Sequence, residues 1–148
     1  MKIWIRNQQK PILLDSRKLR KAAKTVLADL APPDSEVSVS LVGDSQIREL
    51  NRRYLDRDKP TNVLAFSMRE GAFVSLHPQL LGDVVISVDT ARRQSNRFGL
   101  KEVEMVILLM IHGILHLLGY EHEGTKKGSN QMALKQKELF RRVIKEIN

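Results

Sequence analysis

The stretch MVILLMIHGILHLLGYEH, residues 105–122, decides the fold of this chain. Between Met105 and Tyr120 it contains no Lys, Arg, Asp or Glu, and its apolar residues surround the helical axis instead of forming one stripe. Such a helix belongs in a protein core or a membrane. The part from Met105 to Tyr120 is shorter than the about 17–25 residues that span a bilayer, and it carries two histidines. It therefore predicts a buried core helix.

The histidines of this stretch have the spacing of metal ligands. His112 and His116 are four residues apart, so on a helix both rings leave the same face with Cβ atoms about 5–6 Å apart. Gly119 can adopt the left-handed conformation that ends a helix, and the reversal would bring His122 back to that face. The sequence thus predicts one metal ion per chain, bound by three imidazoles.

The type of ligand points to the metal and to its use. Neutral imidazole suits Zn²⁺, with Cu²⁺, Ni²⁺ and Fe²⁺ as alternatives. Three protein ligands with an open fourth position are typical of catalytic zinc, which lowers the pKa of bound water to about 7.

Two neighbours of the histidines bear on the chemistry. Zinc peptidases with His-Glu-x-x-His carry their general base where this chain has Gly113, which argues against the ordinary peptidase mechanism. Gly113 either lets a substrate approach the metal or packs tightly against a strand. Glu121 is the nearest carboxylate for proton transfer or for orienting a ligand, and a solvated Glu121 fits equally well.

Length and composition limit the remaining choices. The 148 residues suggest one domain over residues 1–148. The absence of cysteine excludes disulfides, thiolate zinc sites, iron–sulfur clusters and a cysteine nucleophile. A formal net charge of +8 favours polyanionic partners such as RNA, DNA or anionic lipid, although a merely soluble basic protein is equally consistent with it. The first residues, MKIWIRN, lack the apolar region of a signal peptide, which predicts a cytoplasmic protein without a membrane segment.

Apolar periodicity predicts the other elements. Alternating patterns predict strands over 2–6, 36–42, 62–68 and 82–88, and helical spacing predicts helices over 17–30, 44–54, 90–97 and 132–147 around the core helix. Asp15 or Ser16 is expected to cap the first helix and Asp89 the helix over 90–97. This order favours an α+β domain with a small mixed sheet of about four strands packed with about five helices, and it leaves the strand order open.

A basic segment precedes the third predicted strand. Arg57 and Lys59 lie there on a predicted loop, where they are expected to hold phosphates, and either of them can offset charge developing on a phosphoryl group. Solvated loop charges are the competing interpretation. Aromatic side chains can also stack on bases, although at such positions they more often belong to the core. The aromatic candidates are Tyr54, Phe66, Phe73 and Phe98.

Three blocks of the chain together resemble the YbeY family, bacterial metal-dependent endoribonucleases linked to ribosomal RNA maturation. They are residues 112–122 (HGILHLLGYEH), 51–66 and 81–87 (LGDVVIS). The first block departs from the family pattern once, with Glu121 in place of Asp. The resemblance implies a zincin-like α+β fold and a zinc ion held by His112, His116 and His122. It also implies cleavage of single-stranded RNA in the small ribosomal subunit, including 16S rRNA 3′-end maturation, and a part in ribosome quality control.

The resemblance is incomplete at one position that bears on catalysis. Many members carry an arginine directly after the tyrosine of the second block, and this chain has Leu55 there; Arg57 is the candidate substitute. Besides a zinc-dependent endoribonuclease, two other functions remain open from the sequence. One is an RNA-binding ribosome-assembly factor with a structural metal, and the other is a zinc hydrolase of peptides or small molecules.

Overall fold

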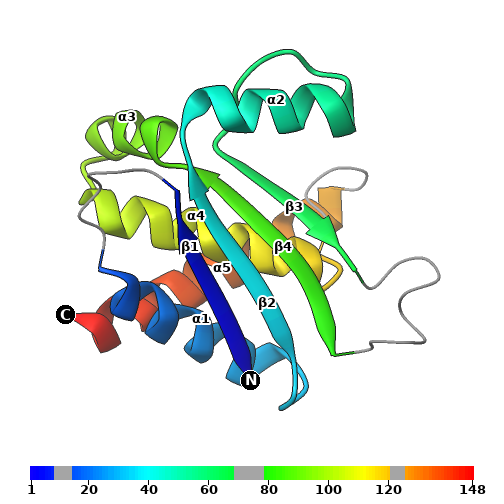
Figure 1. Ribbon diagram of the computed structural model, residues 1–148. Helices are drawn as coiled ribbons and strands as arrows, with labels where there is room; N and C mark the ends of the chain where they lie inside the picture. Colours follow the sequence, from blue (N-terminus) through cyan, green and yellow to red (C-terminus); the bar gives the residue numbers. More distant parts are fainter. Residues whose placement is uncertain (9–14, 69–78, 121–125) are drawn as a thin grey trace.

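The computed structural model describes residues 1–8, 15–68, 79–120 and 126–148 (Figure 1). Within these ranges it contains four strands and five helices, which confirms the predicted α+β class. The elements, in chain order, are β1 (Lys2–Asn7), α1 (Ser16–Leu30), β2 (Glu36–Val42), α2 (Asp44–Leu55), β3 (Val63–Ser67), β4 (Leu80–Ser87), α3 (Val88–Phe98), α4 (Glu102–Leu117) and α5 (Lys126–Ile147).

The strands form one mixed sheet in the order β1-β2-β4-β3. Strands β1, β2 and β4 are parallel, and β3 pairs with β4 in the antiparallel direction. In this register Ile3 lies beside Val37, and Val84 lies between Val39 and Ala65. The order places β3 at the sheet edge, where its outer side borders the cleft described below.

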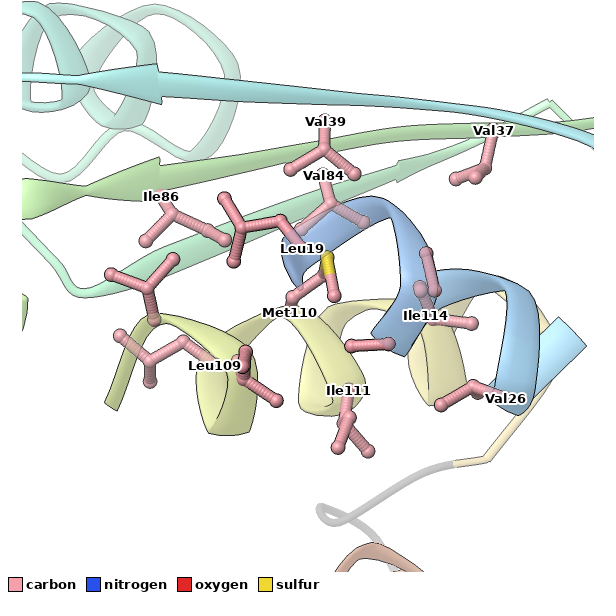
Figure 2. Packing of buried hydrophobic residues seen from close by; sticks show 14 of the residues in the cluster. Leu19, Val26, Val37, Val39, Val84, Ile86, Leu109, Met110, Ile111 and Ile114 are labelled. Atoms are coloured by element: carbon pink, nitrogen blue, oxygen red, sulfur yellow. The ribbon is translucent and has the colours of Figure 1, made fainter. Parts of the chain in front are cut away.

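One face of the sheet is covered by α1 and α4, and α5 packs against both helices from behind (Figure 1). Figure 2 shows apolar side chains of the strands meeting those of α1 and α4 in this layer. Ile114 and Leu115 of α4 are fully buried, and burying such a side chain contributes about 1.5–3 kcal/mol each. The predicted core helix is confirmed. Among the described helices, none is long and apolar enough to cross a membrane.

The opposite face of the sheet is covered at one end by α2. Ile47 of α2 forms a small second cluster with Val42, Leu64 and Val85, one side chain from each of β2, β3 and β4. Near the C-terminal end of α2, Tyr54 contacts Phe66 of β3, so the helix runs close to this edge strand. The two sides of the sheet edge are thereby occupied by α4 and α2, and the space between them becomes the site.

The predicted caps are half right. Asp15 caps α1, with its carboxylate accepting the backbone N–H of Arg17 at 3.0 Å. The expected cap of α3 at Asp89 is wrong, because the helix begins at Val88, two residues before the predicted start at residue 90. Ser87 has the extended backbone of an N-cap, and its hydroxyl accepts the N–H of Thr90 at 3.3 Å.

Candidate active site

Helix α4 brings two predicted metal ligands together. His112 and His116 are partly buried on the same face, and their Nε2 atoms lie 3.2 Å apart. In a tetrahedral site with Zn–N bonds of about 2.0–2.1 Å, two ligand nitrogens stand about 3.3 Å apart. The two imidazoles therefore fit one ion that contacts both Nε2 atoms.

The chain reverses directly after these histidines. Gly119 has φ of 97°, in the positive range predicted for it, and the N–H of Tyr120 donates to the carbonyl of Leu115 at 3.0 Å. His122 and Glu121 lie outside the described residues. Within the part of the chain that is described, no group of three His, Cys, Asp or Glu side chains could hold a metal. The third ligand and the carboxylate therefore stay predictions.

A residue that the sequence analysis missed contacts His112. Gln136 of α5 places its Oε1 atom 2.7 Å from His112 Nδ1, on the side of the ring away from the Nε2 pair. The sequence does contain a signal that could have identified Gln136, because it is a polar residue on the apolar stripe of a helix. Gln136 follows Met132 by four residues and precedes Leu139 by three, and both of those side chains are buried.

Close packing against β4 explains why residue 113 is a glycine. A Cβ atom built on it would meet Cγ1 of Val84 at 2.6 Å and Cγ2 of Val63 at 3.4 Å. The first separation is closer than a real Cβ contact allows, and a β-branched side chain fixed in a strand has little freedom to move. Of the two interpretations of Gly113, the structure supports tight packing against a strand.

A cleft of about 900 Å³ opens beside the two histidines. One wall is α4 with its C-terminal turn, and the other is the end of α2, the following loop and β3. No described residue that lines it carries a carboxylate, whereas two carry a positive charge, which favours an anionic occupant. The lining residues are Asn51, Leu55, Arg57, Lys59–Ser67, His112, Gly113, His116, Gly119 and Tyr120.

The two positive charges belong to residues 56–60, which we call the cationic loop. Asp56 ends α2 with φ of 56°, and the N–H of Arg57 donates to the carbonyl of Asn51 at 3.2 Å. Asn51 is only 2% exposed, and its Nδ2 donates to the carbonyl of Lys59 at 2.9 Å. These bonds fix the backbone that carries Arg57 and Lys59.

The acidic residue between these two cations pairs with α2. Arg48 Nε lies 2.8 Å from Asp58 Oδ1, and the hydrogen bond and charge of Arg48 hold the pKa of Asp58 below its usual value. The carboxylate of Asp58 is thus turned to a partner on α2 and does not line the cleft. The structure thus brings together residues that are distant in the sequence. One cavity is lined by His112 and His116 of α4 and by Arg57 of the cationic loop.

Aromatic residues at the cleft are more exposed than the sequence suggested. Tyr54 is 59% exposed and meets Phe66 edge to face, with ring centroids 5.3 Å apart. Phe66 lines the cleft, as does Leu55, which is 50% exposed. Phe98 is exposed as well, but on α3, and Phe73 lies outside the described residues.

Comparison with known proteins gives consistent matches over almost the whole chain. Residues 4–144 match the family model described as Endoribonuclease YbeY. The chain is 46% identical to Endoribonuclease YbeY of Syntrophotalea carbinolica, with 97% of each chain covered, and 45% identical to that of Geobacter sulfurreducens, with 95% and 94% covered. The solution structure of a Thermotoga maritima protein superposes with a TM-score of 0.68 at 28% identity, covering 97% of this chain and 90% of that one.

Proposed function

This chain belongs to the Endoribonuclease YbeY family, and we propose that it cleaves single-stranded RNA with a zinc ion held by His112, His116 and His122. As a member of this family it is an RNA-cleaving enzyme. The observation that carries the rest of the proposal is the single cleft lined by both the histidine pair and the cationic loop. A metal-binding wall and an anion-binding wall on one cavity suit the cleavage of a phosphodiester.

Zinc fits the side chains that are present. Nitrogen donors at a tetrahedral ligand separation, in a chain without cysteine, favour this metal over those that prefer oxygen or thiolate ligands. When bound, zinc would supply Lewis acidity toward a phosphate oxygen and lower the pKa of a nearby water molecule. His112 and His116 would bind it through unprotonated Nε2 atoms of neutral rings. His122, after the chain reversal, would be the third ligand.

The cationic loop binds and orients the RNA in this proposal. Arg57 can offer two N–H groups to one phosphate, and Lys59 adds a point charge beside it. Because the backbone of residues 56–60 is held by Asn51 and by the end of α2, the attachment points of these two charges are in place before RNA arrives. Arg57 takes the part of the arginine that the family often carries at the position of Leu55.

The preference for single strands follows from the cleft margin. An unpaired base next to the bound phosphate can stack on the exposed ring of Tyr54, which Phe66 supports from the side. A base inside a duplex cannot do so without leaving its stack. We place the substrate in ribosomal RNA of the small subunit, including the 3′ end of 16S rRNA and ribosome quality control, in the cytoplasm, and we assign proton transfer to Glu121.

Metal analysis combined with RNA cleavage tests this function. Purified protein is expected to carry about one zinc per chain, to lose cleavage with a chelator and to regain it when zinc is restored. His116→Ala should fold and bind RNA but leave it uncut. Unchanged cleavage by His116→Ala would overturn the catalytic role of the metal and favour a structural one.

A further inference from the structure

We propose that Gln136 of α5 is a positioning residue for the metal site, acting through His112; this rests on the proposed function. Its Oε1 atom lies 2.7 Å from His112 Nδ1, across 24 residues of sequence. The contact joins the C-terminal helix to α4 on the side of the ring opposite the Nε2 pair. The helix α5 thereby gains a part in metal binding beyond covering the core.

The chemistry of the pair fixes one tautomer. A carboxamide oxygen only accepts hydrogen bonds, so Nδ1 of His112 must carry the proton that it donates to Gln136. In the neutral ring Nε2 is then unprotonated and presents its lone pair toward His116. Metal-bound histidines almost always donate their other ring N–H to such an acceptor, and removing the acceptor typically costs 10–100-fold in metal affinity.

The position of Gln136 on α5 fits this role. It lies on the helical stripe that also carries Met132, Leu139 and Val143, all three of them buried. A polar side chain on such a stripe is costly unless it is hydrogen-bonded, and His112 supplies the bond. Directly before Gln136, the Nζ atom of Lys135 lies 3.3 Å from Oδ2 of Asp29 on α1, and this ion pair helps to hold α5 in place.

A neutral acceptor also suits the charge of the cleft. A carboxylate at this position would orient His112 as well and would make it a stronger ligand. It would, however, add a negative charge near a cavity in which no described lining residue carries one. Gln136 therefore orients the ring without weakening the attraction of the site for RNA phosphates.

Three variants of the full chain separate orientation from packing. Gln136→Leu removes the acceptor, Gln136→Glu keeps one, and Gln131→Leu makes the same apolar change at an exposed position of α5. We expect competition with a chelator to show zinc binding weakened 10–100-fold in Gln136→Leu, unchanged or tighter in Gln136→Glu, and unchanged in Gln131→Leu. Wild-type zinc affinity in a folded Gln136→Leu would overturn the proposal.

A second readout does not depend on zinc. Long-range ¹H–¹⁵N spectra of the metal-free chain report which ring nitrogen of His112 is protonated. We expect a single Nδ1-protonated form in the wild type and a loss of that single form in Gln136→Leu, with thermal unfolding as the check on folding. An identical tautomer in both proteins would overturn the role of Gln136, whereas absent zinc binding by the wild type would overturn the proposed function instead.

Discussion

The two walls of the cleft are built in opposite ways. The α4 wall is core, with Gly113, Ile114 and Leu115 buried between the histidines. The other wall is surface: Leu55 is half exposed, Tyr54 contacts the wall residue Phe66 from the margin, and the cationic loop is fixed by a few hydrogen bonds. The metal ligands are therefore positioned by packing, and the phosphate-binding groups by local hydrogen bonds.

This difference separates stability from substrate handling. A change on the α4 wall affects a helix that is packed against both the sheet and α5, so it is expected to alter folding as well as chemistry. A change in the cationic loop or beside it removes an exposed side chain and should leave the free energy of unfolding nearly constant. The two walls should therefore respond differently to substitution.

Arg57→Ala should change catalysis strongly and stability little. If Arg57 stabilises the charge that develops on the phosphate, kcat should fall on the order of 100-fold while KM changes less. The logarithmic dependence of RNA affinity on salt should weaken by about 0.7, the value for one phosphate contact on a single strand. Single-turnover cleavage and binding at several salt concentrations measure both quantities.

Arg97→Ala on α3 is the matched control for Arg57→Ala, because it removes an exposed arginine that does not line the cleft. It should leave both kcat and the salt dependence unchanged. If Arg57→Ala behaved like this control, Arg57 would have no part in the site. If it lowered the melting temperature by several degrees, the proposed separation between the walls would be wrong.

Gly113→Ala tests the packed wall. The added Cβ would meet Val84 Cγ1 at 2.6 Å, and overpacking of this kind costs about 1–3 kcal/mol. Alanine recovers about 1 kcal/mol through its helix propensity. The free energy of unfolding should fall by up to about 2 kcal/mol, or roughly 4–8 °C in Tm, measured by calorimetry.

Val84→Ala provides the control for that substitution. Removing the two Cγ methyl groups makes room for the new Cβ, so the double variant should be less destabilised than the sum of the single variants. Additive losses would mean that the Gly113–Val84 contact is not what makes glycine necessary. A more stable Gly113→Ala would contradict the packing argument outright.

Much of the fold could be predicted because it depends on local pattern. The uncharged run around His112 and His116 predicted a buried helix, and α4 is that helix. Alternation predicted the strands within about two residues at each end, with β2 matched over Glu36–Val42. Strand order could not be predicted, because no local sequence pattern indicates that β4 lies between β2 and β3.

The candidate site was predicted where spacing alone fixes geometry. A separation of four positions on one helix places His112 and His116 side by side, whatever surrounds them. Gln136 was missed because its contact depends on how α5 packs against α4, across 24 residues. Asn51 was missed for a related reason, since its role depends on the carbonyl of Lys59, a group that every residue has.

Tyr54→Ala tests the stacking margin of the exposed wall. Losing one base–aromatic contact costs about 1–3 kcal/mol, so affinity for single-stranded RNA should fall roughly tenfold, with little change in Tm. Tyr54→Phe keeps the ring and should bind like the wild type. An RNA lacking the stacked base should bind equally to wild type and Tyr54→Ala, which fluorescence titration can measure.

Phe98→Ala is the control for Tyr54→Ala, because it removes an equally exposed ring from α3, away from the cleft. It should not alter RNA affinity. If Phe98→Ala and Tyr54→Ala weakened binding alike, stacking at the cleft margin would lose its support, and a general contribution of exposed aromatics would explain both results.

The smallest expected effect concerns Asp44, which attaches the exposed wall to the rest of the fold. Its carboxylate accepts hydrogen bonds from Ser87 at 2.6 Å, Thr90 at 2.7 Å and Arg93 at 2.8 Å, joining the start of α2 to the start of α3. Burial raises the pKa of Asp44, but these three bonds together with the charge of Arg93 outweigh it and hold the pKa below its usual value.

A lowered folded pKa sets the direction of the pH dependence. The stabilisation from Asp44 is complete above the unfolded pKa of about 3.9 and is lost as pH falls through the lower folded pKa. Asp44→Asn should therefore lower Tm at neutral pH, and its difference from wild type should shrink below about pH 4. The exposed Asp34→Asn corrects for the loss of one surface carboxylate. If the difference in Tm between Asp44→Asn and wild type stayed constant from pH 7 to pH 3, the charge of Asp44 would not hold α2. The apolar packing of Ile47 alone would then position α2 and the cationic loop that follows it.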